Sequence, residues 1–230
     1  MSAVSPNMEA ILRWDVRNWS RAVEFWDRNL PNDISGQTAL EIGAGEGGLS
    51  LYLASRGCMA ICTDYGRAAA KAMEHHAAHG LGDLVDYART DAAHLPFPDA
   101  TFDVAAFKSV LGGIGRHGGL DGQKRTINEL HRVLRPGGMV IFADNLRATP
   151  IHQFIRRTFV PWGHDWRYPD PEEFREFFSQ FAGCEIRTFG VMAALGRSER
   201  QRAILHYLDC LLSPLVSARA RYIGYGFAIK

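Results

Sequence analysis

The feature that most constrains the fold is an alternation of short apolar segments with helical segments between residues 38 and 145. Strands are expected over 38–42, 59–63, 84–90, 102–107 and 139–143, and helices over 48–56, 67–79 and 124–133. A glycine-rich loop is expected over 112–122. Strands separated by helices predict right-handed crossovers, which set the strands side by side and parallel. We therefore predict an α/β fold with a doubly wound, Rossmann-like, mostly parallel sheet covered on both faces.

The flanking segments complete a single predicted domain over 1–230, a length that one hydrophobic core can serve. Residues 1–37 form a leading helical segment, and 38–145 form the core. Residues 146–230 are expected to cover an acceptor site. Within them, strands over 186–191 and 222–229 are expected to close the sheet as an antiparallel hairpin. A leucine-rich helix is expected between these two strands. Its leucine stripe is predicted to pack in the core, with a lipid-facing surface as the alternative, and comprises Leu205, Leu208, Leu211, Leu212 and Leu215.

Composition excludes several classes of protein. The net charge of +1 provides no overall field for nucleic acid. The four cysteines have neither zinc-site nor redox spacing, so we expect no metal site and a reducing, cytoplasmic location. No signal-like segment begins the chain, and its longest apolar run, 203–216, is too short to span a bilayer. Nothing indicates the oligomeric state.

A glycine-rich loop follows the first expected strand. Gly43, Gly45 and Gly48 satisfy the G-x-G-x-x-G spacing of dinucleotide-binding proteins, in which glycines allow a tight turn and close approach of a ligand to a helix N-terminus. Glu41 ends the strand before them. A carboxylate at this position suits a cofactor that carries an ammonium and a sulfonium group, whereas it repels a pyrophosphate.

Two further acidic residues follow the next two strands. Asp64 ends the second strand and can accept both hydrogen bonds of a ribose diol, although it can also cap the next helix. Asp91 follows the third strand. Ligands of such sheets bind beyond the carboxyl ends of the strands, so both side chains are expected at one binding site.

Four stretches occur in order over roughly residues 38–145: EIGAGEGG, CTDYG, TDAAHLPFPDATFDVA and LHRVLRPGGMVIFAD. Through them the chain resembles the class I S-adenosylmethionine (SAM)-dependent methyltransferases, in the group that includes quinone-biosynthesis and other small-molecule enzymes. The segment after the fourth strand, the Trp-rich N-terminal helix and the aromatic loop 162–168 are also similar to stand-alone methyltransferases of bacterial surface-glycan synthesis.

The resemblance implies that SAM is the cofactor. We expect the acceptor to be a small molecule or a glycan, with oxygen as the acceptor atom. It places Asp64 at the ribose hydroxyls and Asp91 at the adenine amino group, with the Ala92 backbone beside it. It also places three residues around the methionine end, namely Glu41, Gly43 and Gly45. Lys108 departs from the common pattern: it either lines the methionine pocket or is a surface lysine with a buried stem.

Methyl transfer to a hydroxyl requires alignment of donor and acceptor and removal of a proton. His117, in the predicted glycine-rich loop, and His164, in the aromatic loop, are the candidate bases, and Asp144 is a weaker one. Three histidines are expected to be solvated on an outer helix: His75, His76 and His79. Three aromatic side chains are expected to form a lid or acceptor platform, or else a hydrophobic plug: Trp162, Trp166 and Tyr168.

Two other functions stay open at this point. A nicotinamide (NAD)-dependent oxidoreductase would use the same glycines, but Glu41, Asp91 and the lack of a separate substrate domain argue against it. A non-catalytic SAM-binding protein would retain the fold and the acidic residues without turnover.

Overall fold

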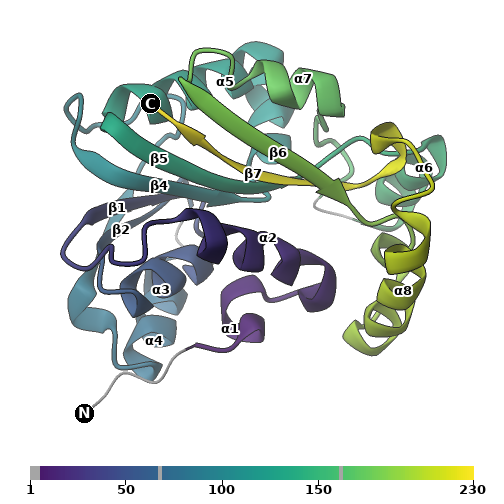
Figure 1. The fold of residues 1–230 in the computed structure, drawn as a ribbon, viewed down its shortest axis with the longest axis horizontal. Helices are drawn as coiled ribbons and strands as arrows, with labels where there is room; N and C mark the ends of the chain where they lie inside the picture. Colours follow the sequence, from purple (N-terminus) through teal and green to yellow (C-terminus); the bar gives the residue numbers. More distant parts are fainter. Residues whose placement is uncertain (1–5, 67–68, 161–162) are drawn as a thin grey trace.

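The computed structural model describes residues 6–66, 69–160 and 163–230. Its centre is a seven-stranded sheet of order β3-β2-β1-β4-β5-β7-β6 (Figure 1). Parallel pairing joins β1 to both β2 and β4, and continues outward to β3 and β5. The strands are β1 (Thr38–Ile42), β2 (Met59–Asp64), β3 (Val85–Arg89), β4 (Phe102–Lys108), β5 (Leu134–Asn145), β6 (Gly183–Phe189) and β7 (Ile223–Ile229). The predicted mostly parallel α/β sheet is confirmed.

The last two strands close the sheet in antiparallel fashion. β7 pairs with β5, with Met139 opposite Ile229, and β6 pairs with β7. This confirms the predicted antiparallel closure. The connection between β6 and β7 is long, because it contains the helix α8 (Glu199–Leu212).

Helices cover both faces of the sheet (Figure 1). One face carries α1 (Met8–Leu12), α2 (Val16–Asn29), α3 (Gly48–Ser55) and α4 (Ala69–Ala78), and the other carries α5 (Leu111–Val133) and α7 (Pro171–Glu176). The remaining helices, α6 (Pro150–Phe159) and α8, lie together at one end. The described residues also form three short 3-10 helices, at Gly82–Leu84, Ala193–Leu195 and Ala218–Ala220.

Two helical segments differ from prediction. The leading helix is divided into α1 and α2, because Arg13 and Asp15 have positive φ values of 71° and 46°. The loop predicted over 112–122 is wrong: α5 begins at Leu111 and continues to Val133, with a kink at Gly119 (φ 59°). The glycine-rich segment at the start of α5 packs against the loop that holds Trp166. This tertiary packing stabilises the helix although glycine has a weak helix propensity.

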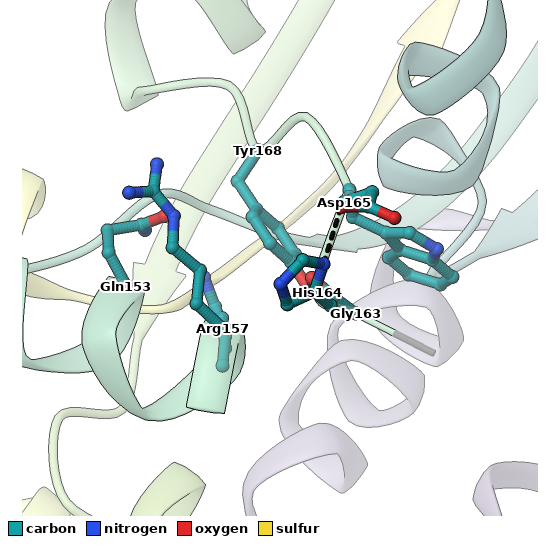
Figure 2. A pocket seen from close by; sticks show the side chains of 8 residues that line it. Gln153, Arg157, Gly163, His164, Asp165 and Tyr168 are labelled. Atoms are coloured by element: carbon teal, nitrogen blue, oxygen red, sulfur yellow. Dashed lines mark hydrogen bonds and ion pairs between the residues drawn. The ribbon is translucent and has the colours of Figure 1, made fainter. Parts of the chain in front are cut away.

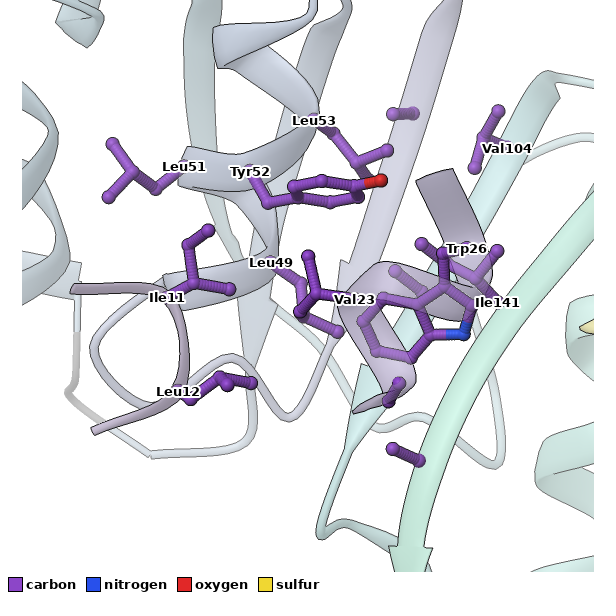
Figure 3. Close-up of a cluster of buried hydrophobic side chains, with 14 of the residues drawn as sticks. Ile11, Leu12, Val23, Trp26, Leu49, Leu51, Tyr52, Leu53, Val104 and Ile141 are labelled. Atoms are coloured by element: carbon purple, nitrogen blue, oxygen red, sulfur yellow. The ribbon is translucent and has the colours of Figure 1, made fainter. Parts of the chain in front are cut away.

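A hydrophobic core lies on each side of the sheet. On the α1–α3 side, Ile11, Leu12 and Trp26 pack with leucines of α3 (Figure 3). The core on the α5–α7 side is aromatic, and the rings of Phe142 and Phe178 stack with centroids 4.1 Å apart. Burial of aromatic rings contributes the largest apolar areas in such cores. The two cores fix the strand ends from which the site is built.

The leucine stripe of α8 contradicts the prediction that it packs in the core. Leu208, Leu211 and Leu215 are exposed. The inward side of α8 is polar instead, because buried Asp209 accepts hydrogen bonds from the backbone amides of residues 191, 192 and 193. Among the described residues, no helix is both long enough and apolar enough to cross a membrane.

Candidate active site

The loop after β1 turns sharply beneath the segment that follows β4. Gly43 and Gly45 both have positive φ, at 59° and 57°, which glycine adopts without strain. A Cβ atom on residue 43 would come within 2.6 Å of the Val110 side chain, whereas one on residue 45 would meet no atom within 4 Å. Gly43 therefore permits close packing, and Gly45 leaves open space beside the loop.

The carboxylate of Glu41 is turned toward the start of α3. It accepts hydrogen bonds from the amides of Leu49 (3.1 Å) and Ser50 (2.6 Å) and is buried. Burial raises the pKa of Glu41 to about 7, although the bonds from Ser50 and the charge of Lys108 act in the opposite direction. Glu41 thus anchors the glycine loop to α3 by occupying free amides at the helix N-terminus.

Asp64 lies at the carboxyl end of β2, beside the glycine loop. Its Oδ2 accepts from the Gly45 amide (2.9 Å) and its Oδ1 from the Gly66 amide (2.7 Å). A cavity of about 70 Å³ opens here, lined by Ala44, Gly45, Cys62, Asp64, Gly66, Tyr87, Ala88 and Arg89. A carboxylate has about four lone-pair directions, so both oxygens can accept further hydrogen bonds from a ligand.

Asp91 and Ala92 lie in the loop after β3. The Thr90 amide donates to the Asp64 carbonyl (3.1 Å), which holds this loop next to the end of β2. Asp91 is half-exposed, and its Oδ1 accepts from the Ala93 amide (2.9 Å). That bond is the main cause of the lowered pKa of Asp91, so the side chain carries a negative charge at neutral pH.

Lys108, at the end of β4, points into a cluster of buried acids and indoles. Its Nζ lies 4.8 Å from the Trp19 ring centroid and 5.8 Å from that of Trp14. Burial lowers the pKa of Lys108 to about 8, against the raising effect of Asp144 and Glu41. Lys108 is therefore half-buried, with its amino group turned toward the indoles. Its charge also acts on Glu41, the residue that anchors the glycine loop.

Asp144, proposed as a weaker candidate base, is fully buried at the tip of β5. It accepts hydrogen bonds from the amides of Val110 (2.9 Å), Leu111 (2.8 Å) and Asn145 (2.7 Å). Burial raises its pKa to about 6. Through these contacts Asp144 fixes the start of α5 beneath the site.

A second, larger cavity of about 310 Å³ lies between α6 and the aromatic loop (Figure 2). His164 lines it, with its Nδ1 2.5 Å from the carboxylate of Asp165. Trp166 and Tyr168 also line it, and the guanidinium of Arg156 lies 4.1 Å from the Tyr168 ring centroid. The cavity combines aromatic faces with cationic groups. Trp162, the third predicted aromatic, lies outside the described residues.

The two candidate bases occupy different environments. His164 lines the larger cavity, whereas His117 lies on the exposed side of α5. His164 thus lines a cavity with two of the predicted aromatic side chains, although its own side chain is also exposed.

Two buried polar groups that the sequence interpretation missed support the site. Asp15, next to Trp14, is fully buried and accepts a hydrogen bond from the Tyr222 hydroxyl, which also accepts from the Asn18 side chain. His76 was expected to be solvated, which is wrong: it is buried and bonds to the Gly47 carbonyl (2.8 Å) and to a tyrosine hydroxyl. His76 thereby fixes the far end of the glycine loop.

The fold and site define a class of protein. The sheet has the strand order 3-2-1-4-5-7-6 with an antiparallel seventh strand, and a glycine loop and acidic residues follow its first three strands. This is the architecture of the Rossmann-like methyltransferases. Phosphoethanolamine N-methyltransferase 2 of Haemonchus contortus, solved with S-adenosylhomocysteine, shares this fold at 19 % identity and a TM-score of 0.66. The match covers 92 % of this chain and 53 % of that one.

Comparison of sequences gives the family. Residues 40–142 match the Methyltransferase domain family. Demethylmenaquinone methyltransferase of Clavibacter sepedonicus is 27 % identical over 126 residues, covering 55 % of this chain and 47 % of the relative. Phthiotriol/phenolphthiotriol dimycocerosates methyltransferase 1 of Mycobacterium ulcerans is 36 % identical over 139 residues, covering 54 % and 48 %. The chain thus spans about half the length of these relatives, and it contains a class I SAM-dependent methyltransferase domain.

Proposed function

We propose that this protein transfers the methyl group of SAM to a hydroxyl group of a small-molecule acceptor. The observation that carries the proposal is the position of Asp64 at the carboxyl end of β2. There its carboxylate lies against the Gly45 amide at the wall of a cavity, within the segment that matches the methyltransferase domain family.

The residues around this cavity fit the cofactor. Asp64 has lone pairs free for the two ribose hydroxyls, and Gly45 has no side chain that would block the methionine end. Asp91 is the acceptor for the adenine amino group, next to the Ala92 backbone. Glu41 supports the site indirectly, because its carboxylate binds the first amides of α3 and thereby fixes the turn at Gly43. Lys108, at the end of β4, is proposed to lie at the methionine end of the bound cofactor.

When bound, SAM supplies a methyl carbon already activated by its sulfonium. The chain's own task is to align the acceptor, exclude water and remove the hydroxyl proton. The larger cavity, with His164, Trp166 and Arg156, suits an acceptor that has a flat or apolar body and a polar end. The names of the two relatives, which refer to a quinone and to phthiotriol derivatives, support a small-molecule acceptor. A glycan acceptor stays a prediction.

The family match argues against the NAD-dependent alternative, whereas a non-catalytic SAM-binding protein requires a direct test. Ligand at a hundred times its dissociation constant stabilises a protein by about 2.7 kcal/mol, which a thermal-shift assay resolves. We expect a shift with SAM and S-adenosylhomocysteine and none with NAD. Transfer of radiolabel from methyl-labelled SAM to hydroxylated quinols or phenols then tests turnover. A shift without any labelled product from extracts or pure acceptors would favour the non-catalytic alternative.

A further inference from the structure

The helix α8 presents its apolar side to the outside of the molecule. Asp209 and Ser213 are buried on its inward side. The outward side has exposed fractions between 44 % and 76 % for its large apolar residues, namely Ile204, Tyr207, Leu208, Leu211 and the following Leu215. A surface helix normally faces its apolar stripe toward the core, so α8 is reversed in this respect.

The neighbouring helix α6 has the same reversed arrangement. His152 and Arg156, one helical turn apart, are buried against the protein. Three large apolar side chains of α6 are between 58 % and 64 % exposed: Ile151, Phe154 and Phe159. Ile151 and Phe154 lie opposite His152 and Arg156 around the helix, as the 3.6-residue repeat requires.

The two helices are fixed to one backbone segment. His152 of α6 bonds to the Val191 carbonyl (2.7 Å), and Asp209 of α8 accepts from the Val191 amide (2.8 Å). The guanidinium of Arg197, just before α8, lies 5.6 Å from the ring centroid of Phe159 at the end of α6. Both helices therefore belong to one end of the molecule (Figure 1), and we name their exposed apolar residues the α6–α8 face.

Positive charge surrounds the α6–α8 face. Segments 147–160 and 197–221 together contain eight arginines and only two acidic residues, although the whole chain has a net charge of +1. Both acids are engaged inward, because Glu199 accepts from the Asp15 amide (2.8 Å) and Asp209 accepts from the amides of residues 191–193. Arg157, Arg197 and Arg200 are exposed. Arg147, Arg202 and Arg219 form ion pairs with Asp170, Glu199 and Glu172, and Arg156 is buried. The positive charge that this end presents to solvent therefore comes mainly from the three exposed arginines.

We propose that the α6–α8 face docks on the surface of an anionic lipid bilayer. Exposed leucine, isoleucine and phenylalanine side chains surrounded by arginines are the composition of helices that lie in the membrane interface, where apolar groups enter the acyl boundary and cations contact the headgroups. No helix among residues 6–66, 69–160 and 163–230 could span the bilayer, so the contact is with the surface. Gln153, Arg156 and Arg157 of α6 also line the larger cavity, which therefore lies next to the docked surface.

A second copy of the chain is the main rival occupant. A two-fold dimer through this face would bring each patch against its own counterpart, so the arginines around one face would meet those of the other. Like charges brought together in this way disfavour the interface, whereas the same arginines favour anionic lipid. Charge complementarity therefore selects the bilayer.

The test is flotation of the full chain with vesicles of phosphatidylcholine, with and without about 30 % phosphatidylglycerol. We expect binding to the anionic vesicles to be at least about tenfold tighter than to the neutral ones, and to weaken in about 0.5 M salt. The double variant I204E/L211E should reduce binding to anionic vesicles by at least about tenfold, because both side chains would leave the acyl boundary. Arg197→Glu with Arg200→Glu should abolish the preference for anionic lipid.

The matched control is M59E/M73E, which places two charges at apolar residues that are similarly exposed but lie on β2 and α4. It should bind vesicles like the wild type. All variants should keep the wild-type affinity for S-adenosylhomocysteine and the wild-type melting temperature, which shows that they fold. The proposal is overturned if the wild type does not float with anionic vesicles, or if I204E/L211E floats equally well. It is also overturned if the wild type is a dimer by light scattering that I204E/L211E converts to a monomer.

Discussion

The indole of Trp166 lies against the backbone of Gly112, so closely that a Cβ atom on residue 112 would come within 2.5 Å of the indole carbon Cε3. The Arg167 amide donates to the Gly112 carbonyl (3.1 Å), and the Gln123 side chain donates to the carbonyls of Leu111 and Arg167. The first turn of α5 and the aromatic loop are therefore held together, although more than fifty residues separate them in sequence.

Gly112→Ala should displace Trp166, because the added methyl group has no room. Overpacking of this kind costs about 1–3 kcal/mol, which urea unfolding measures. If the indole is part of the acceptor platform, the KM for the acceptor should also rise while S-adenosylhomocysteine binding is unchanged. Gly118→Ala is the control, since a Cβ there meets no atom within 4 Å. Equal stability of the wild type and Gly112→Ala would contradict this account of the contact.

Asp64 and Asp91 should contribute unequally to cofactor binding. Asp64→Ala removes the acceptor for two ribose hydroxyls, whereas Asp91→Ala removes the acceptor for one amino group. We expect each change to weaken binding by about 1–3 kcal/mol, with the larger loss for Asp64. Calorimetric titration with S-adenosylhomocysteine gives both values. Asp86→Ala, at an exposed residue of β3, is the control. Wild-type affinity in both site variants would mean that the cofactor binds elsewhere.

The fold was predictable to a large extent, because parallel strands covered on both faces must be apolar along their length. Segments such as 38–42 and 102–107 can therefore be recognised as strands from their apolar sequence alone. The start of α5 was not predictable, because its glycines indicate a loop. Contacts with the distant Trp166 and Asp144, and with Gln123 further along α5, hold this segment as a helix. The prediction that the leucines of α8 pack in the core was wrong for a related reason. The periodicity of a sequence indicates that a helix has an apolar side, but not the direction in which that side faces.

The candidate site was predictable where chemistry follows a strand end. Gly45, Asp64 and Asp91 lie at neighbouring strand ends, as their spacing implied, although their contacts with a cofactor stay a prediction. The direction of a side chain was not predictable: Glu41 is turned to the amides of α3. Nor was the Asp15–Tyr222 pair, because its partners are 207 residues apart and no local pattern relates them.

The stability of the Asp15→Asn variant, relative to that of the wild type, should increase as pH rises. Burial raises the pKa of Asp15 from 3.8 to about 7. An acid that binds its proton more tightly when folded stabilises the protein fully below its unfolded pKa and loses that contribution as pH rises through the folded pKa. The unfolding free energy of the variant relative to wild type should therefore increase by about 1–3 kcal/mol between pH 4 and 7 and then level off. Asparagine also tolerates the left-handed backbone of residue 15.

Asp103→Asn is the matched variant of opposite sign. Burial opposes the charge of Asp103, but hydrogen bonds from Arg135 and Thr38 outweigh it and lower the pKa of Asp103. Its contribution to stability is present above the unfolded pKa and is lost as pH falls, so this variant should become less favourable, relative to wild type, as pH rises from acid to neutral. Parallel pH profiles for the two variants would contradict the assignment for Asp15.

His164→Ala should separate catalysis from cofactor binding. His164 lines the larger cavity and is oriented by Asp165, whereas His117 is exposed on α5. If the acceptor is a hydroxyl and His164 removes its proton, turnover in His164→Ala should fall by about 10²–10⁴-fold while S-adenosylhomocysteine binding is kept. His117→Ala is the matched control and should retain turnover. A loss confined to His117→Ala would transfer the role of base to α5. Full turnover in the double variant would exclude a histidine base, and would favour either an amine or carbon acceptor, or catalysis by alignment alone.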